Sequence, residues 1–368
     1  MNKLSNCILA IIMIAAALLL SVGGTMLNID AKRILLTIVA AAVGAAFAVF
    51  VNRCGANRVL KLASWLAGGL VLVLFLTRFT PLGCSVHGSR RYFHLLGFHF
   101  TPALLSMPII CLFWAHCTTL PPVSVKRWLL PLLVTTAVTA LVLAEPFISM
   151  AGMIAVFALV LLVLWKPGPK SIVLCAAAAV LIGAASVAAV LNHRAERGQK
   201  DFYRHLFSPD PQTNYHTWSL HTTLKHSAFV GKHHIPETMP HHIPNAEHDA
   251  PLVAGCGEFG YIFMIAALLL TSVIIACGVV LTIRNRRMPD RLLTGGMTAS
   301  IALPALINTA MMFGLLPMGG VAFPFLSHGG TAMLSNFFAL GLIVVASIHG
   351  CKDFTPEKNF RMESTVQD

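Results

Sequence analysis

The sequence predicts an all-α polytopic membrane protein with ten transmembrane helices. Of its 368 residues, 57% are hydrophobic and only 11% are charged, whereas a soluble domain carries about 25% charged residues. A helical span needs about 20 apolar residues, and the charges of this chain stand between apolar stretches of about that length. The composition therefore excludes a water-soluble enzyme. It also excludes a disordered chain, because disordered chains have low hydrophobicity.

The expected spans lie between the charged residues, because a charge at the bilayer centre is costly. The last uncharged gap, from Arg291 to Lys352, is too long for one helix, and prolines and glycines in its middle divide it into two. The first hydrophobic stretch exceeds the 7–15 residues of a signal-peptide core, so it counts as a span. The ten expected spans are 5–27, 34–51, 60–77, 103–117, 128–144, 147–165, 171–191, 259–283, 293–316 and 331–349.

Lysines and arginines in short loops indicate the orientation, because they collect on the cytoplasmic side. With the N-terminus inside, 15 of the 26 Lys and Arg residues fall in cytoplasmic segments. Both termini, including a tail at 351–368, are therefore expected in the cytoplasm. The net charge of +12 is attributed to this topology and to anionic membrane lipids. No nucleic-acid partner is expected, because the sequence contains no base-reading motif.

One long outer loop, residues 192–257, separates the seventh and eighth spans within a single domain of residues 1–368. It holds ten of the sixteen histidines, and loops of this length are uncommon unless they are functional. Metal binding is one interpretation, with the pairs His233-His234 and His241-His242 or the series His216, His221 and His226 as candidates. Adjacent histidine side chains rarely point at one ion. A step of five residues does not place side chains on one helix face, so a solvated surface is favoured and no metal ligand is assigned.

Three carboxylates, Glu247, Asp249 and Glu258, lie near the end of this loop. The chain has only 14 Asp and Glu residues, so such a group beside a membrane boundary is informative. Partial desolvation raises the basicity of a carboxylate, which makes Asp249 a candidate general base or cation ligand. Glu258 has two interpretations of equal weight: a functional carboxylate, or a charge that the dipole stabilises at a helix N-terminus.

The nine cysteines contain no CxxC pair, and most fall inside spans. Cys84 and Cys256 are both expected near the outer face, where an oxidising compartment permits a disulfide. Two free thiols are the favoured alternative.

Three motifs resemble those of the SEDS family of RodA, FtsW and SpoVE. Ile243-Pro-Asn-Ala-Glu-His-Asp249, followed by Gly257-Glu-Phe-Gly260, is similar to the family's LPEAHTDFIF…GEELG region. The stretch from Gly314 to Thr331, GLLPMGGVAFPFLSHGGT, is similar to GLLPVTGIPLPFISYGGS, and the stretch from Gly88 to Phe93 is similar to GARRWL. The resemblance covers essentially the whole chain.

This resemblance implies a peptidoglycan glycosyltransferase that serves cell elongation or division. Such an enzyme transfers lipid II-linked disaccharide units to the growing glycan strand, on the outer face of the bacterial cytoplasmic membrane. Its expected partner is a class B penicillin-binding protein. Asp249 matches the family's essential outer-loop carboxylate, which implies a general base acting while undecaprenyl diphosphate leaves.

Arg90 and Arg91 would hold the diphosphate, because forked guanidinium donors suit phosphate oxygens. A divalent cation is an alternative source of positive charge, although the spacing of residues does not indicate one. The remaining residues expected to bind substrate are Glu258, Ser327, His328, Gly329 and Gly330. His328 replaces a family Tyr, and filling that position is the favoured interpretation over a bond to the diphosphate. The two glycines are expected to permit a tight turn.

The chain also departs from the family pattern. A family Glu and Lys, three residues apart, are replaced by Leu104 and Met107. Loss of both charges leaves an apolar helix face that can pack against its neighbours. Loss of only one would leave the other charge unpaired in the membrane. The family's QPDLGT begins here at Glu145, and its Asp becomes Phe147; whether Glu145 substitutes for that acid is left open.

Two other functional classes are considered. A flippase for lipid-linked precursors would place ionisable groups near the membrane midplane, but these spans carry almost no charge. A catalytically weakened scaffold for the penicillin-binding protein would explain the lost Glu, Lys and Asp. The intact Asp249 favours the polymerase.

Overall fold

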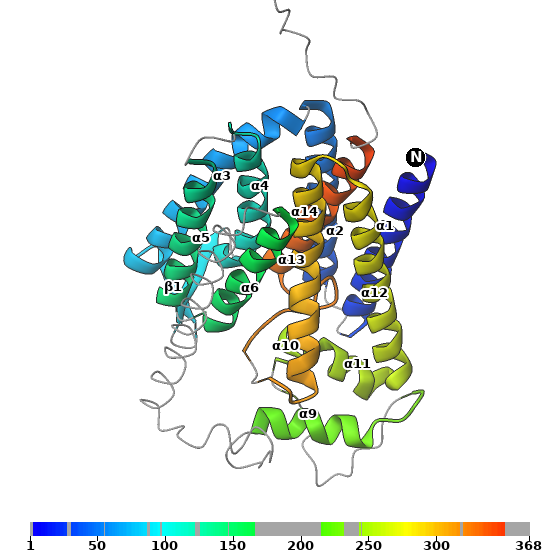
Figure 1. Ribbon diagram of the computed structural model, residues 1–368. Helices are drawn as coiled ribbons and strands as arrows, with labels where there is room; N and C mark the ends of the chain where they lie inside the picture. Colours follow the sequence, from blue (N-terminus) through cyan, green and yellow to red (C-terminus); the bar gives the residue numbers. More distant parts are fainter. Residues whose placement is uncertain are drawn as a thin grey trace, which may run out of the picture.

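The computed structural model shows a bundle of long helices with a small sheet and short helices at one end (Figure 1). It describes residues 3–27, 31–54, 56–86, 89–95, 98–121, 126–145, 147–165, 215–231, 243, 245–316 and 319–349.

Eight helices are long and apolar enough to cross a membrane. They are α1 (Lys3–Met26), α2 (Ala31–Cys54), α3 (Ala56–Phe79), α5 (Lys126–Ala144), α6 (Ile148–Trp165), α12 (Tyr261–Arg284), α13 (Met288–Met312) and α14 (Gly330–His349). A 3₁₀ turn, η1 (Pro102–Leu105), leads into the shorter apolar helix α4 (Ser106–Thr118). The helical membrane class is thus confirmed, and nine of the ten expected spans correspond to these helices. The expected span 171–191 lies outside the described residues, as does the tail 351–368, so the count of ten stays a prediction.

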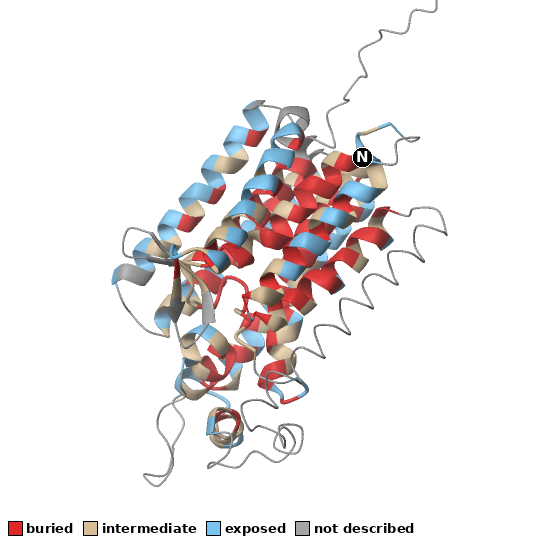
Figure 2. Ribbon diagram, turned by 90° about the vertical axis from the view of Figure 1, so that its left-hand side faces the viewer, coloured by how far each residue is buried: buried red, intermediate tan, exposed pale blue. Residues whose placement is uncertain are grey.

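Helices α13 and α14 lie in the middle of the bundle (Figure 1), where buried residues are concentrated (Figure 2). In each of them, 67% of the most apolar window is buried, against 17% in α2. Helix α13 packs against α4, α6, α12 and α14, and α14 packs against α2. The approach of α2 to α14 requires Gly44, because a Cβ there would lie 2.8 Å from the backbone oxygen of Phe337. Small residues bring membrane helices together in this way.

A three-stranded antiparallel sheet follows α3 and was not part of the all-helical prediction. It consists of β1 (Gly83–Val86), β2 (Ser89–Leu95) and β3 (Phe98–Phe100), with β2 in the middle. Gly83 pairs with Phe93, and Phe93 pairs with Phe100. The sheet carries the Arg90-Arg91 motif on its central strand.

The described part of the stretch expected to be one outer loop includes the helices α9 (Tyr215–His226), α10 (Ala246–Asp249) and the start of α11 (Pro251–Phe259). All three lie at the same end of the bundle (Figure 1). Helix α12 begins at Tyr261, after a break at Gly260. Gly260 has φ +87°, and a Cβ there would meet the backbone oxygen of Phe229 at 2.7 Å, so this break requires glycine.

One sequence-based interpretation is wrong in this region. Glu258 lies in the last turn of α11, where the helix dipole disfavours a negative charge, so it is no N-terminal helix charge. Cys84 and Cys256 are both free thiols, which is the alternative that the sequence favoured over a disulfide.

Candidate functional site

Asp249 ends the short helix α10, at the same end of the bundle as α9 and α11 (Figure 1). Its backbone N–H donates to the oxygen of Asn245, at 3.0 Å, and Asn245 itself adopts φ +52°. The left-handed residue and the single helical turn point the chain back to the bundle, where Pro251 starts α11. The Asp249 carboxyl is thereby placed on the segment that begins at Gly320, since a Cβ on Gly320 would lie 3.7 Å from Oδ1 of Asp249.

Asn308 of α13 fixes this arrangement. Its Nδ2 donates to the backbone oxygen of Asp249 at 2.8 Å and to that of Val321 at 2.6 Å. The Asn308 side chain is fully buried, so the two bonds connect α13, α10 and the segment after α13 in a dry environment. Sequence reasoning missed this residue, although a polar side chain inside an apolar span is a signal of function.

The segment 319–329 returns the chain from α13 to α14 without forming a helix. Val321 and residues 323–327 are buried, and non-helical backbone at membrane depth must be buried in protein or line a water-filled cavity. Ser327 is buried, and its Oγ accepts the N–H of Phe323 at 2.6 Å. The turn uses φ +65° at Gly320 and φ +60° at Phe325. The expectation for Gly329 and Gly330 is therefore wrong, because neither has a positive φ in this turn.

His328 follows this turn and lies against α10. Its backbone N–H donates to the oxygen of Glu247 at 2.9 Å, and the rings of His328 and His248 have centroids 5.3 Å apart. The structure thus brings His328 together with the segment that carries Asp249, and its role in binding substrate stays a prediction. His248 is a neighbour that sequence reasoning did not single out, although it adjoins Asp249 in the motif.

The electrostatic environment makes Asp249 a stronger base than an ordinary aspartate. Burial raises the pKa of Asp249, and the charges of His248, His216 and Arg91 oppose this rise. His216 comes from α9 and Arg91 from β2, so two elements distant in sequence act on the same carboxyl. A partly buried carboxylate can accept a proton while the permanent charge of Arg91 stabilises an anionic group.

Arg91 is held by aromatic contacts. Its guanidinium carbon lies 5.1 Å from the ring centre of Tyr92 and 4.8 Å from that of Phe147, which are cation–π distances. The side chain of Arg90 lies outside the described part of the chain. Glu258 is exposed at the far end of α11 from Asp249. Among the described residues, no three His, Cys, Asp or Glu side chains are grouped so that they could hold a metal ion.

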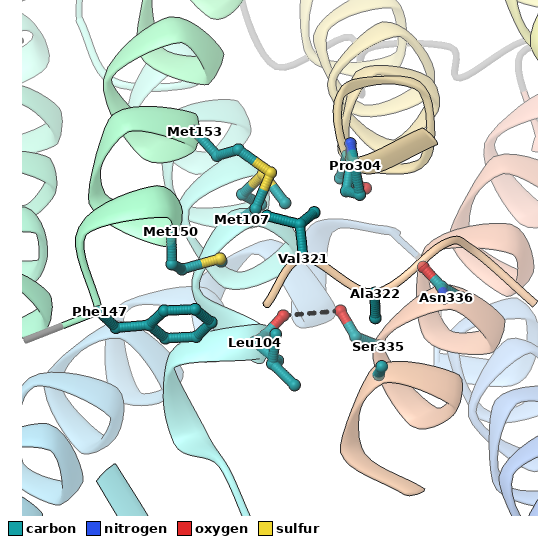
Figure 3. Close-up of a pocket in the computed structure, with 12 residues that line it drawn as sticks. Leu104, Met107, Phe147, Met150, Met153, Pro304, Val321, Ala322, Ser335 and Asn336 are labelled. Carbon is teal, nitrogen blue, oxygen red and sulfur yellow. Dashed lines mark hydrogen bonds between the residues drawn. The ribbon is translucent and has the colours of Figure 1, made fainter. Parts of the chain in front are cut away.

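A largely apolar cavity of about 30 Å³, which Ser300, Ser335 and Asn336 also line, lies within the bundle (Figure 3). Leu104, Met107 and Phe147, the three positions where the resembling family has charged residues, all line it. The sulfur-bearing side chains of Met150 and Met153 complete the wall on the side of α6 (Figure 3). The Ser335 hydroxyl donates to the oxygen of Leu104 at 2.8 Å. The charge replacements therefore converge in space on one methionine-rich packing region.

Comparisons with known proteins agree with this architecture. The FtsW/RodA/SpoVE cell cycle protein family matches residues 3–351. A probable peptidoglycan glycosyltransferase FtsW from Mycobacterium tuberculosis is 26% identical over 76% of this chain and 54% of its own length. The corresponding Enterococcus hirae protein is 24% identical over 83% of this chain and 78% of its own length. The chain thus spans about half the length of the mycobacterial relative.

Solved structures show the same fold. A chain from a peptidoglycan synthase complex, whose title describes coordination of polymerization and crosslinking, aligns with TM-score 0.72 and 22% identity, over 94% of this chain and 98% of that one. Thermus thermophilus rod shape determining protein RodA aligns with TM-score 0.65 and 20% identity, over 94% of this chain and 97% of its own. With a family match over nearly its whole length, the chain is a multi-pass membrane protein that belongs to the FtsW/RodA/SpoVE family of cell cycle proteins.

Proposed function

We propose that this chain is a lipid II-dependent peptidoglycan glycosyltransferase of the bacterial cytoplasmic membrane. The observation that carries the proposal is the partly buried Asp249 carboxyl, whose pKa is raised by burial while the charges of His248, His216 and Arg91 act on it. The family membership and the names of the relatives support the same activity. Polymerisation of lipid II by the purified protein tests it.

In the proposed reaction, Asp249 takes the proton from the attacking hydroxyl of the acceptor sugar. That oxygen forms a bond to the anomeric carbon of the donor sugar as the bond from this carbon to undecaprenyl diphosphate breaks. The proton stays on the carboxyl of Asp249, and the electron pair leaves with the diphosphate. Positive charge from Arg91 stabilises the departing anion.

The proposed partner is a class B penicillin-binding protein, which would cross-link the glycan made at the outer end. A lipid flippase is less consistent with the interior, because the cavity residues Leu104, Met107 and Phe147 are apolar and transporters use ionisable groups there. A scaffold without activity would not need the base-strengthening environment of Asp249.

The proposed orientation puts α9 outside and the α12–α13 connection in the cytoplasm. Lys225 and Arg286 are both exposed, so they form a matched pair for cysteine labelling. Each new cysteine is introduced into a variant of the protein whose native cysteines are replaced. In intact cells, we expect a membrane-impermeant thiol reagent to modify Lys225→Cys and to spare Arg286→Cys. Opening the cells should make Arg286→Cys reactive as well. Labelling of Arg286→Cys alone in intact cells would contradict the orientation.

Arg91 is expected to bind the donor diphosphate. Arg91→Ala should raise the donor KM about tenfold or more, because a hydrogen bond to a charged group contributes about 1.5–3 kcal/mol. Arg91→Lys should restore affinity only in part, since a point charge replaces a fork. Steady-state kinetics with lipid II measure both. Arg286→Ala, at the cytoplasmic end, is the control, and a donor KM unaffected by Arg91→Ala would rule out this role.

A further inference from the structure

Glu145 is a buried acid that the mechanism above does not use. It lies in the short connection between α5 and α6, and its side chain is 0% exposed. Neither of its carboxyl oxygens accepts a hydrogen bond from the described part of the chain. An ionised carboxylate without hydrogen bonds in such a place is strongly unfavourable, whereas the neutral acid is much less so.

Two arginines flank the connection that carries Glu145. The Nε of Arg78, at the end of α3, donates to the oxygen of Ala144 at 2.6 Å. Arg91 of β2 lies over the ring of Phe147, two residues after Glu145. These are the cations whose charges act on the Glu145 carboxyl, and burial outweighs them, raising the pKa of Glu145 to about 8.

Arg91 also connects this acid with the candidate site, because its charge acts on Asp249 as well. An ionised Glu145 would compete for the Arg91 guanidinium, whereas a neutral Glu145 would leave its charge directed to Asp249 and to an anionic substrate. A protonated Glu is nearly isosteric with Gln, the residue that the similar family motif carries at this position.

We propose that Glu145 is a positioning residue, held as the neutral acid, which keeps the Arg91 guanidinium directed towards Asp249 and the donor diphosphate. This inference rests on the proposed function. As the pH rises through about 8, Glu145 ionises and draws Arg91 away. Glu145→Gln fixes the neutral form and removes this change.

The kinetic experiment follows the donor KM between pH 7 and pH 9 in purified protein. The wild type should show a rise of about tenfold, the size expected for a weakened charge-assisted hydrogen bond. Glu145→Gln should show no such rise. Asp290→Asn, which replaces a different carboxyl by an amide in the first turn of α13, is the control. Its donor KM should rise with pH as in the wild type. The same rise in Glu145→Gln, or loss of its activity at pH 7, would overturn the proposal.

A second measurement does not depend on activity. An acid whose pKa is raised by folding binds more protons when folded, so the protein loses stability as the pH rises from about 4.5, the ordinary value, through about 8. The thermal unfolding temperature of the wild type should therefore fall over this range relative to that of Glu145→Gln. If the difference between the two unfolding temperatures stayed constant over this pH range, the proposal that Glu145 is held as the neutral acid would be overturned. If the wild type makes no glycan at any pH, the proposed function fails, and this melting comparison alone decides the state of Glu145.

Discussion

Asp249→Asn should reduce glycan polymerisation by about 10²- to 10⁴-fold, the usual contribution of a general base. Asparagine keeps the size of the side chain but cannot take the proton from the acceptor hydroxyl. The side-chain Nδ2 of Asn308 donates a hydrogen bond to the backbone oxygen of residue 249. This bond does not depend on the carboxyl, so the fold around α10 should persist. Gel separation of lipid-linked products measures the rate, and protein abundance and binding to the penicillin-binding protein should be unchanged.

Glu247→Gln is the matched control for this variant. Glu247 lies on the same helical turn, two residues away, and its backbone oxygen accepts the N–H of His328. That bond survives the change of side chain, so Glu247→Gln should have a much smaller effect. Equal losses in the two variants would mean that negative charge around α10 matters and that Asp249 is not the base. A normal rate in Asp249→Asn would remove the mechanism altogether.

Met107→Lys should destabilise the protein by about 3–5 kcal/mol, the cost of an unpaired charge in the interior. Met107 is 4% exposed and faces an apolar cavity with Leu104, Phe147 and two further methionines. Among these lining side chains, none is charged. The thermal unfolding temperature of the detergent-solubilised variant should therefore fall sharply. Met107→Leu conserves volume and polarity and should cost less than about 1.5 kcal/mol.

Adding Leu104→Glu to Met107→Lys tests whether the Glu and Lys of the similar family stabilise each other as an ion pair at these two positions. Residue 104 precedes residue 107 by about one helical turn at the junction of η1 and α4, so the new charges can meet. The double variant should then be more stable than Met107→Lys alone, with a coupling of about 1 kcal/mol or more. Additive losses would show that the present packing no longer accepts an ion pair.

The sequence predicted the long helices well, because the thickness of the membrane sets the length of an apolar span and keeps charges at its ends. Neither constraint depends on tertiary contacts. Expected spans such as 34–51 and 128–144 fall inside α2 and α5. The small sheet was missed, because short strands between Phe79 and Pro102 leave no mark on a hydropathy pattern. The break at Gly260 was missed too, since it depends on the approach of Phe229, a residue 31 positions away.

The candidate site was predictable where a motif carried it and not where packing created it. The motifs led to Asp249, Arg91 and His328. In the structure, the backbone N–H of His328 bonds to α10 and the charge of Arg91 acts on Asp249. Asn308 lies outside those motifs, and only the fold brings its amide to Asp249. Glu145 is likewise buried because of the way α5, α6 and their neighbours pack, and no local sequence pattern predicts this burial.

The most direct test of the account is an assay of lipid II polymerisation by the purified protein, alone and with candidate class B penicillin-binding proteins. The account predicts long lipid-linked glycan chains from the wild type with its proper partner, and none above background from Asp249→Asn in the same complex. A stable complex that yields no glycan from the wild type, or equal yields from the wild type and Asp249→Asn, would contradict it.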